Sequence, residues 1–484
     1  MRKKEKKSKD QYKKSIMFLS SLIMVAVYTG IFSYVWLFYY NNREIVWGFY
    51  KRGNWVLVLI YVLLILVVTK VYNAFKISHM KLSDTVYSHL LSMLIVNVIT
   101  YFQISLIART MLNVLPFLLM TAADVIFMIL WAWINAKLFT KLYPPHNMIM
   151  VYGSKLAESI SEKMQSREDR YSINKYVHID EGVETICQMI PDYESVIICD
   201  VPSKKRNILL KYCFEKSIRV YMVPKISDIL IRGSEEIHMF DSPLLLSRNM
   251  GLNFSQRFFK RLLDLILVIP LTVIASPFML VIAAAIKIYD RGPVIYKQER
   301  LTLDAKPFYV YKFRSMIVDA EKDGRARLAS DKDDRITPVG RVIRKIRMDE
   351  LPQLFNILFG QMSFVGPRPE RPSIAEEYER EMPEFKYRTK VKAGLTGYAQ
   401  VLGKYNTTPY DKLKLDLTYI VKYSLLLDIK LIFMTVKILF MSESTEGFTD
   451  NSIPNANSGC QPHLVDDTEP EKESENKEEN KENE

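Results

Sequence analysis

The sequence contains few cysteines, and their positions exclude two common ways of holding a small fold together. Only four occur among 484 residues, at Cys187, Cys199, Cys213 and Cys460. None forms a C-x-x-C pair, and the spacing indicates neither a disulfide framework nor a zinc site. No cage of cysteine and histidine is visible in the sequence. Three of the four lie in one predicted soluble domain, which is typical of a reducing cytoplasm.

The sequence also lacks the glycine-rich turn G-x-G-x-x-G of dinucleotide-binding folds. Gly153 stands where the first glycine would be, but Lys155 occupies the position of the second. Around this turn, the apolar stretches "NMIMVYG", "ESVIICDV" and "SIRVYMVP" alternate with helical stretches, and this pattern predicts a parallel, doubly wound sheet. We therefore expect a Rossmann-like domain over residues 142–250 with a structural or regulatory role. Binding of a phosphate at a helix N-terminus is the alternative.

A nucleic-acid partner is not expected, although the net charge is +12. The chain lacks aromatic platforms and a recognised reading helix, and its basic residues follow the ends of apolar segments instead. Such a basic chain suits anionic lipid surfaces or substrates rich in phosphate. Ten acids against three lysines lie between Val465 and Glu484. This low-complexity stretch predicts a disordered acidic tail over residues 447–484.

Long apolar runs are present, and they predict a membrane protein. Four of them cover residues 16–40, 55–75, 84–107 and 111–135, and each reaches the roughly 20 residues that a spanning helix needs. The segment 1–14, "MRKKEKKSKDQYKK", is basic and is expected to stay in the cytoplasm. Four transmembrane helices over 15–141 would then return the chain to the cytoplasmic side. We do not expect a cleaved signal peptide.

A fifth apolar run, "KRLLDLILVIPLTVIASPFMLVIAAAIKIYDRGP", differs from the other four. Both of its flanks are basic, and Ser276 and Pro277 interrupt it near the middle. Proline removes one backbone donor and clashes with the preceding turn of a helix. These features predict a re-entrant helix over 260–290 that enters and leaves by the same membrane face. A kinked transmembrane span is the alternative.

Two adjacent carboxylates, Asp349 and Glu350, follow a basic helical stretch, "GRVIRKIRM". Arg341, Arg344 and Arg347 recur every three residues there, so they are expected on one side of an amphipathic helix at a membrane surface. Asp349 is expected to cap the next helix, which would make the pair an ordinary helix start. Nearby arginines or a divalent cation would instead keep both acids ionised for chemistry.

Further cations stand on either side of this acidic pair. Lys312 and Arg314 lie in "YKFRSM", and Arg368 lies between two prolines in "GPRPE". The prolines fix the backbone, and a guanidinium group matches phosphate oxygens in pairs. Ionised carboxylates, phosphate-binding cations and a membrane hairpin together predict attack on a phosphate group with a lipid participating.

Residues 253–445 resemble the bacterial sugar transferase family, the monotopic polyprenyl-phosphate phosphoglycosyl transferases. The resemblance is carried by the Ser276–Pro277 hairpin, "YKFRSM", "DDRITPVGRVIRKIRMDELPQL", "MSFVGPRPE", "KAGLTGYAQ" and "YSLLLDIKLIFMT". The four spans and the degenerate nucleotide-type domain are similar to the large-form members. The fold class implied is a mixed α and α/β membrane protein with a mostly helical catalytic domain over 251–446.

By this resemblance, the chain is expected to move a sugar 1-phosphate from a UDP-sugar to undecaprenyl phosphate and to release UMP. The family's nucleophile matches Asp349, which would form a covalent intermediate, and its glutamate matches Glu350. Arg344 and Arg368 match family arginines that contact phosphate. Mg²⁺ is implied, with Asp349 as its ligand. The pathways implied are capsule, exopolysaccharide or O-antigen synthesis at the bacterial cytoplasmic membrane, with the catalytic domain facing the cytoplasm.

Three positions depart from the family pattern. We expect them to affect how the substrate fits and not whether the reaction takes place. Thr302 stands where a glycine is usual, and Ala393 and Tyr398 replace a proline and a tryptophan. A catalytically idle membrane scaffold for polysaccharide assembly is the alternative function, although the intact Asp349–Glu350 pair argues against it. A homodimer is a further expectation from large-form relatives. The sequence does not identify the sugar.

Overall fold

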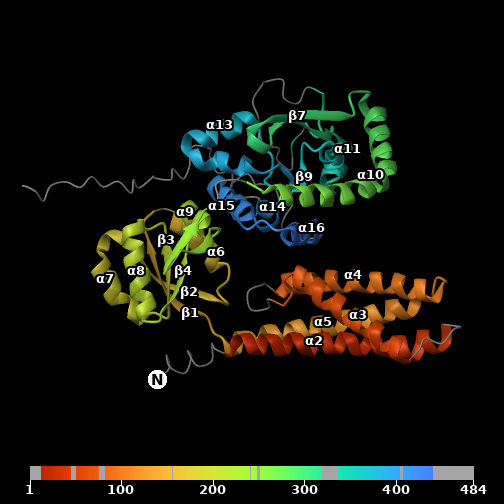
Figure 1. Ribbon diagram of the computed structural model, residues 1–484, viewed down its shortest axis with the longest axis horizontal. Coiled ribbons are helices and arrows are strands. Elements are labelled where there is room, and N and C mark those ends of the chain that lie inside the picture. The colour runs from red at the N-terminus through yellow and green to blue at the C-terminus, as the bar shows by residue number, and fades with distance from the viewer. Residues whose placement is uncertain are drawn as a thin grey trace, which may run out of the picture. The chain divides into compact units, whose positions relative to one another are not determined.

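The computed structural model describes residues 12–44, 51–75, 82–154, 156–239, 241–247, 251–318, 333, 335–403 and 407–439. The predicted acidic tail lies outside these residues. The chain divides into two compact units, of which the second is built from Pro144–Lys225 and the first from the residues up to Tyr143 together with those from Ile226 onward. Figure 1 shows the elements of both units.

The four N-terminal apolar runs each form one long helix: α2 Lys13–Val35, which continues as the π-helix η1 Trp36–Glu44, then α3 Lys51–Val71, α4 Leu82–Ala108 and α5 Leu115–Leu142. Polar side chains connect these helices from within. Tyr61 donates to Asn97 Oδ1 at 3.2 Å, and Asn97 donates to Thr121 Oγ1 at 3.0 Å. With α10 Phe254–Asp290, the described residues hold five helices that are long and apolar enough to cross a membrane.

The second unit contains the predicted parallel sheet, which is confirmed. Its strands are β1 His146–Tyr152, β2 Tyr171–His178, β3 Ser195–Cys199 and β4 Arg219–Met222, in the order β2-β1-β3-β4. The connecting helices are α6 Leu156–Gln165, α7 Val183–Met189 and α8 Ser203–Glu215, with the 3₁₀ turns η2 Ile179–Glu181 and η3 Ile190–Asp192. Strand β2 was not predicted, because "YSINKYVH" is mostly polar and lacks an apolar run.

Side chains of β1 and β3 alternate between two apolar layers, so both faces of the sheet are buried. Ile149 and Val151 pack with α7 and α8, whereas Met148 and Met150 pack with Ala157 of α6. Figure 1 accordingly shows α7 and α8 on one side of the sheet. At the turn after β1, a Cβ on Gly153 would lie 2.4 Å from the carbonyl oxygen of Asp200, so only glycine fits there.

The rest of the first unit forms a mixed region whose described residues contain helices and three two-stranded sheets, one of them the antiparallel pair of β5 and β6. Strands β7 and β8 are antiparallel, and β9 and β10 are parallel. The elements are α9 Ile226–Ile231, β5 Glu235–Met239, β6 Ser242–Leu246, α10 Phe254–Asp290, β7 Ile295–Leu301, η4 Leu303–Ala305, β8 Pro307–Phe313, α11 Pro338–Lys345, η5 Met348–Glu350, α12 Gln353–Leu358, β9 Ser363–Val365, α13 Pro372–Glu381, η6 Pro383–Lys390, β10 Gly394–Thr396, α14 Tyr398–Leu402, α15 Pro409–Val421 and α16 Leu425–Leu439.

Helix α10 contains Pro270 and Pro277 and continues through both of them. In Figure 1 it changes direction sharply partway along its length. Pro277 has no N–H to donate to the carbonyl of Val273, four residues earlier. The hydroxyl of Ser276 donates to that carbonyl instead, at 2.7 Å. The Ser276–Pro277 pair therefore breaks the backbone ladder while keeping the freed carbonyl bonded.

Buried polar groups fix the first part of α10 to the strands and helices around it. Lys260 forms an ion pair with Asp428 of α16 at 2.7 Å, and Tyr419 donates to the same carboxylate at 2.8 Å. One turn further, Asp264 accepts from the backbone N–H of Phe364 and the hydroxyl of Ser363, both at 3.0 Å. These contacts connect α10 directly to strand β9.

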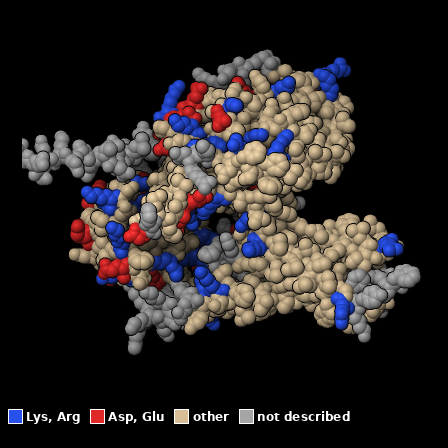
Figure 2. Space-filling view, in the orientation of Figure 1, with Lys and Arg blue, Asp and Glu red and all other residues tan. Residues whose placement is uncertain are grey.

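The outward faces of the long helices carry few charges. In Figure 2 the surfaces over α2–α5 and over α10 are almost free of acidic and basic groups. On α10, Leu280 and Val281 are 72% and 69% exposed, and Val273 and Ile274 are similarly open. Exposed apolar surface of this extent suits contact with lipid.

Candidate active site

Three elements bring the predicted site residues together. Lys312 lies on β8, Asp349 and Glu350 lie on the 3₁₀ turn η5, and Arg368 lies in the loop after β9. The buried Asn356 of α12 binds strand β8, since it donates to the carbonyl of Tyr309 at 2.7 Å and accepts from the N–H of Tyr311 at 2.9 Å. The helix after the acidic pair is thereby fixed to the strand that carries Lys312.

Glu350 is held by two cations. Lys312 Nζ lies 2.9 Å and an Arg368 nitrogen 3.2 Å from the same oxygen, Oε1. Burial by itself would raise the pKa of Glu350. The charges of Lys312 and Arg368, with a smaller contribution from Arg347, nevertheless hold that pKa well below its ordinary value of 4.5. Glu350 is therefore ionised throughout the physiological pH range.

Asp349, the neighbouring acid, is in a different state. Its carboxylate forms no ion pair with any residue that the structure describes. Burial, and then the negative charge of Glu350, raise its pKa above the ordinary value, and the charges of Lys312 and Arg344 offset this only in part. The adjacent acids thus differ, because one is engaged by cations while the other is left with its oxygens available.

The local backbone around the acidic pair corrects two expectations. Helix α11 ends at Lys345, and Arg347 follows with a φ of 58°, so the three arginines do not share one helix face. Asp349 lies inside η5 and caps no helix; the residue before α12 is Pro352. A positive φ is unfavourable for a non-glycine residue, and such strain is concentrated at functional sites. The positive φ of Arg347 changes the direction of the chain, so Asp349 and Glu350 do not continue helix α11.

The remaining predicted residues lie apart from the acidic pair or contact it indirectly. Arg344 influences Asp349 through its charge, and its guanidinium group makes no hydrogen bond or ion pair with the described residues. Arg314 is buried and pairs with Asp290 at the end of α10. In this structure it therefore connects β8 to the membrane helix, and its predicted contact with phosphate stays a prediction. Ser276 lies within α10.

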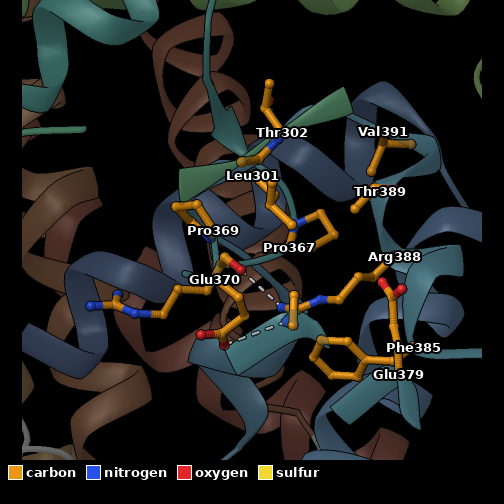
Figure 3. A pocket seen from close by; sticks show the side chains of 13 residues that line it. Leu301, Thr302, Pro367, Pro369, Glu370, Glu379, Phe385, Arg388, Thr389 and Val391 are labelled. Carbon is orange, nitrogen blue, oxygen red and sulfur yellow. Dashed lines mark hydrogen bonds and ion pairs between the residues drawn. The ribbon is translucent and has the colours of Figure 1, made fainter. Parts of the chain in front are cut away.

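A pocket lies beneath the loop that carries Arg368. It is lined by Leu301, Thr302, Pro367, Arg368, Pro369, Glu370, Ala375, Glu379, Phe385, Arg388, Thr389, Val391 and Ala393. Figure 3 shows Arg388 extending across this pocket toward Glu370, with Phe385 beside it. Arg388 is one of the buried polar residues near the site that the sequence did not reveal. Its partners lie 18 to 28 positions away in the chain, and no local pattern indicates such pairs.

The donor set fits a magnesium ion held jointly by protein and substrate. Among the described residues, no group of three or more histidine, cysteine, aspartate or glutamate side chains could hold a metal. Mg²⁺, however, commonly binds through one or two carboxylates together with substrate phosphates and water. The unpaired carboxylate of Asp349 suits this arrangement. Oε2 of Glu350, which takes neither of the two cation contacts, lies next to it in the chain.

The family pattern described as bacterial sugar transferase matches residues 255–442. A UDP-glucose:undecaprenyl-phosphate glucose-1-phosphate transferase of Caulobacter vibrioides is 38% identical over 191 residues, which are 71% of that protein and 38% of this chain. The chain belongs to the bacterial sugar transferase family. The residues that form the site, from Lys312 to Arg368, all fall within the matched region.

Two further bacterial sugar transferases match over longer stretches. The Klebsiella pneumoniae protein named UDP-glucose:undecaprenyl-phosphate glucose-1-phosphate transferase is 36% identical over 299 residues, covering 61% of this chain and 59% of that one. The Aeromonas hydrophila protein named UDP-N-acetylgalactosamine-undecaprenyl-phosphate N-acetylgalactosaminephosphotransferase is 38% identical over 233 residues, covering 47% and 54%. The chain thus spans little more than half the length of these relatives. Their names also include different sugars.

Proposed function

We propose that the protein transfers a sugar 1-phosphate from a UDP-sugar to undecaprenyl phosphate and releases UMP, as an initiating membrane step of capsule, exopolysaccharide or O-antigen synthesis. The observation that carries this proposal is the difference between the two acids. Glu350 is neutralised by Lys312 and Arg368, whereas Asp349 beside it has no ion pair within the described residues. A carboxylate that is left without an ion pair, beside cations that can bind phosphate oxygens, is suited to nucleophilic attack.

In the first step, a carboxylate oxygen of Asp349 attacks the phosphorus that bears the sugar. The bond from that phosphorus to the bridging oxygen breaks, and UMP leaves with the oxygen and the electron pair. The product on the protein is an acyl phosphate, in which the Asp349 carboxylate carries the phosphosugar. In the second step, an oxygen of undecaprenyl phosphate attacks the same phosphorus and displaces the carboxylate. One phosphoanhydride is exchanged for another, so no additional energy source is needed.

Glu350 acts in this scheme by orienting charge rather than by accepting a proton. Because its pKa is held well below the ordinary value, it is a weak base at neutral pH. Its contact keeps the Arg368 guanidinium beside Asp349, where phosphate oxygens would lie during transfer. Arg344, already close enough to lower the pKa of Asp349, supplies a second positive charge. Cations at this place stabilise the negative charge that develops on the transferring phosphoryl group.

Asp349, together with the substrate phosphates, would hold the implied magnesium ion. When bound, Mg²⁺ supplies charge neutralisation and polarises the phosphoryl oxygens. Asp349 would thus both help to hold the ion and supply the attacking oxygen. Removal of Mg²⁺ by a chelator is therefore expected to stop UMP release.

The membrane arrangement is proposed from α10. Its bend, its two prolines and the bonded Val273 carbonyl support a helix that enters and leaves by the cytoplasmic face, with α2–α5 crossing the membrane. The catalytic region would then meet UDP-sugars in the cytoplasm and the lipid carrier at the membrane surface. The division into segments 15–141, 142–250 and 251–446, and the homodimer, stay predictions.

The test is UMP release by the detergent-solubilised full chain with Mg²⁺ and undecaprenyl phosphate. The donors are UDP-glucose, UDP-galactose, UDP-N-acetylgalactosamine and further UDP-sugars, because the relatives differ in their sugar. We expect release with one donor, and a loss of at least about a thousandfold in Asp349→Asn, since a group that forms the covalent intermediate is removed. The exposed Asp169→Asn, in the second unit, serves as the matched control.

Two outcomes would contradict the proposal. Release by Asp349→Asn at the wild-type rate would remove Asp349 from the mechanism. Absence of UMP release with every donor would favour the idle scaffold. This conclusion requires that the protein tested is folded, as shown by cooperative thermal unfolding.

A further inference from the structure

The loop Gly366–Glu370 is fixed through its carbonyl groups. Four consecutive carbonyls each accept a hydrogen bond, and two of the donors are backbone amides. Gly394 N–H donates to the carbonyl of Pro367 at 2.9 Å, and Leu301 N–H donates to that of Glu370 at 3.0 Å. Since Pro367 and Pro369 have no N–H, this loop has few donors of its own with which to attach itself to the rest of the fold.

Arginine side chains serve the two carbonyls in the middle of the loop. Arg388 donates to the carbonyl of Arg368 at 2.9 Å, and Arg300 donates to the carbonyl of Pro369 at 3.0 Å. The first of these carbonyls belongs to the residue whose guanidinium contacts Glu350. The Arg388 side chain therefore holds the backbone of the residue that carries the Arg368 guanidinium.

Carboxylates fix both arginines in turn. Arg388 pairs with Asp416 at 2.8 Å and with Glu370 at 3.4 Å, and Glu370 also lies 3.8 Å from Arg300. The Arg388 and Asp416 side chains are only 6% and 1% exposed. Buried charges destabilise a fold unless they are paired and well bonded, so four charged side chains are not needed merely to attach a surface loop. Their place under the loop that carries Arg368 indicates that this loop must be positioned accurately.

We propose that Arg300 and Arg388, with Glu370 and Asp416, form a clamp that positions Arg368 for catalysis. Arg388 and Arg300 are positioning residues in this scheme: they bind the backbone of the loop, and of these three arginines it is Arg368 whose guanidinium contacts Glu350. Guanidinium groups suit the task, because their forked donors can serve a carbonyl and a carboxylate at once. The inference rests on the proposed function, since it assigns these residues a part in phosphate transfer.

The first arm of the test measures hydrogen–deuterium exchange and does not depend on activity. Arg388→Lys keeps a positive charge opposite Asp416 but loses the fork that reaches the carbonyl of Arg368. We expect amide exchange to accelerate about tenfold or more in the peptides that contain Leu301 and Gly394, because their partners in the loop are released. Exchange in α12 and in the second unit should stay unchanged. Unchanged exchange at both loop peptides would overturn the clamp.

The second arm is a double-mutant cycle on UMP release. Arg388→Lys is expected to lower kcat/KM by about ten- to a hundredfold in the wild-type background, the size of one charge-assisted hydrogen bond. In an Arg368→Lys background the same change should cost less than about threefold, because its target is already gone. Equal losses in both backgrounds would show that Arg388 does not act through Arg368.

Arg380→Lys is the matched control for the cycle. Arg380 is exposed on α13 in the same region and takes no part in the clamp, so exchange and kcat/KM should both remain at wild-type values. If the wild-type protein releases no UMP, the proposed function fails, while the exchange measurement still decides whether Arg388 holds the loop. Failure of the clamp and failure of the function are thus separable.

Discussion

The Pro144–Lys225 unit and the region from α10 to α16 use ion pairs in opposite ways. In the former, pairs such as Arg167–Asp169 and Lys205–Asp180 lie at the surface, with acid side chains 43% and 74% exposed. In the latter, Lys260–Asp428 and Arg388–Asp416 are enclosed, with all four side chains at most 7% exposed. Apolar strand faces hold the first fold together, whereas charges hold particular segments of the second.

The difference in the burial of ion pairs shows in which region individual segments must be positioned accurately. Two apolar layers close the four-stranded sheet on both of its faces. Around the acidic pair, a membrane helix and a proline-containing loop must both be fixed relative to η5. Exposed pairs contribute about 0–1 kcal/mol, and breaking one partner of a buried pair costs about 3–5 kcal/mol. Substitutions in the two regions should therefore differ strongly.

Lys260→Met should produce the largest loss of stability. It leaves the buried Asp428 carboxylate without its cation, and we expect the free energy of unfolding to fall by about 3–5 kcal/mol. Denaturant unfolding of the solubilised protein measures this. In the double variant Lys260→Met/Asp428→Leu, part of the loss should be recovered, because the Asp428 carboxylate that lost its cation is also removed.

Asp169→Asn is the matched change in the other unit. Its free energy of unfolding should stay within about 0.5 kcal/mol of the wild-type value. An equal loss in Asp169→Asn and Lys260→Met would remove the contrast between the two regions.

Glu350→Gln should have a smaller effect that depends on pH. The pKa of Glu350 is depressed in the folded protein, so its stabilisation is complete above the ordinary value of 4.5 and is lost progressively as the pH falls below it. At pH 7 we expect a loss of about 1–3 kcal/mol, because charge-assisted bonds to Lys312 and Arg368 disappear. Unfolding at about pH 3 should show a smaller difference between variant and wild type. A difference that grows on acidification would contradict the assigned sign.

The smallest expected effect concerns two departures from the family pattern that turn out to be in contact. The hydroxyl of Thr302 donates to the carbonyl of Gln361 at 2.9 Å and accepts from the N–H of Ala393 at 3.2 Å. A glycine at 302 would remove the acceptor, and a proline at 393 would remove the donor. We expect Thr302→Gly and Ala393→Pro to be coupled by about 1 kcal/mol in a double-mutant cycle of unfolding. Additive losses would show that the two departures are independent.

Much of the fold could be predicted because its signals are local. Hydropathy located all five long helices, and short apolar runs located three of the four strands of the parallel sheet. Strand β2 escaped because its side chains are largely polar and exposed, with only Val177 fully buried in the core. At the edge of a sheet, backbone pairing with β1 suffices without an apolar pattern.

The candidate site was predicted in part. Lys312 and Arg368 do meet Glu350, and Arg344 does act on Asp349 by its charge. The helical continuation through Arg347 failed, because that residue adopts a positive φ that no spacing rule announces. The clamp residues were missed for a different reason. Arg388 reaches partners in the Gly366–Glu370 loop and on α15, and a single sequence does not indicate which distant charges fold together.

The Ser276–Pro277 pair provides its own hydrogen bond at the break in helix α10. The serine hydroxyl satisfies the one carbonyl that the proline leaves open, so the bend depends on no neighbouring helix to keep its polar groups away from hydrocarbon. At Pro277 the freed carbonyl is therefore bonded within the segment itself. A peptide of α10 in lipid bicelles should bend at the same residues, and Ser276→Ala should leave it straighter or less firmly inserted when the two peptides are compared by oriented NMR.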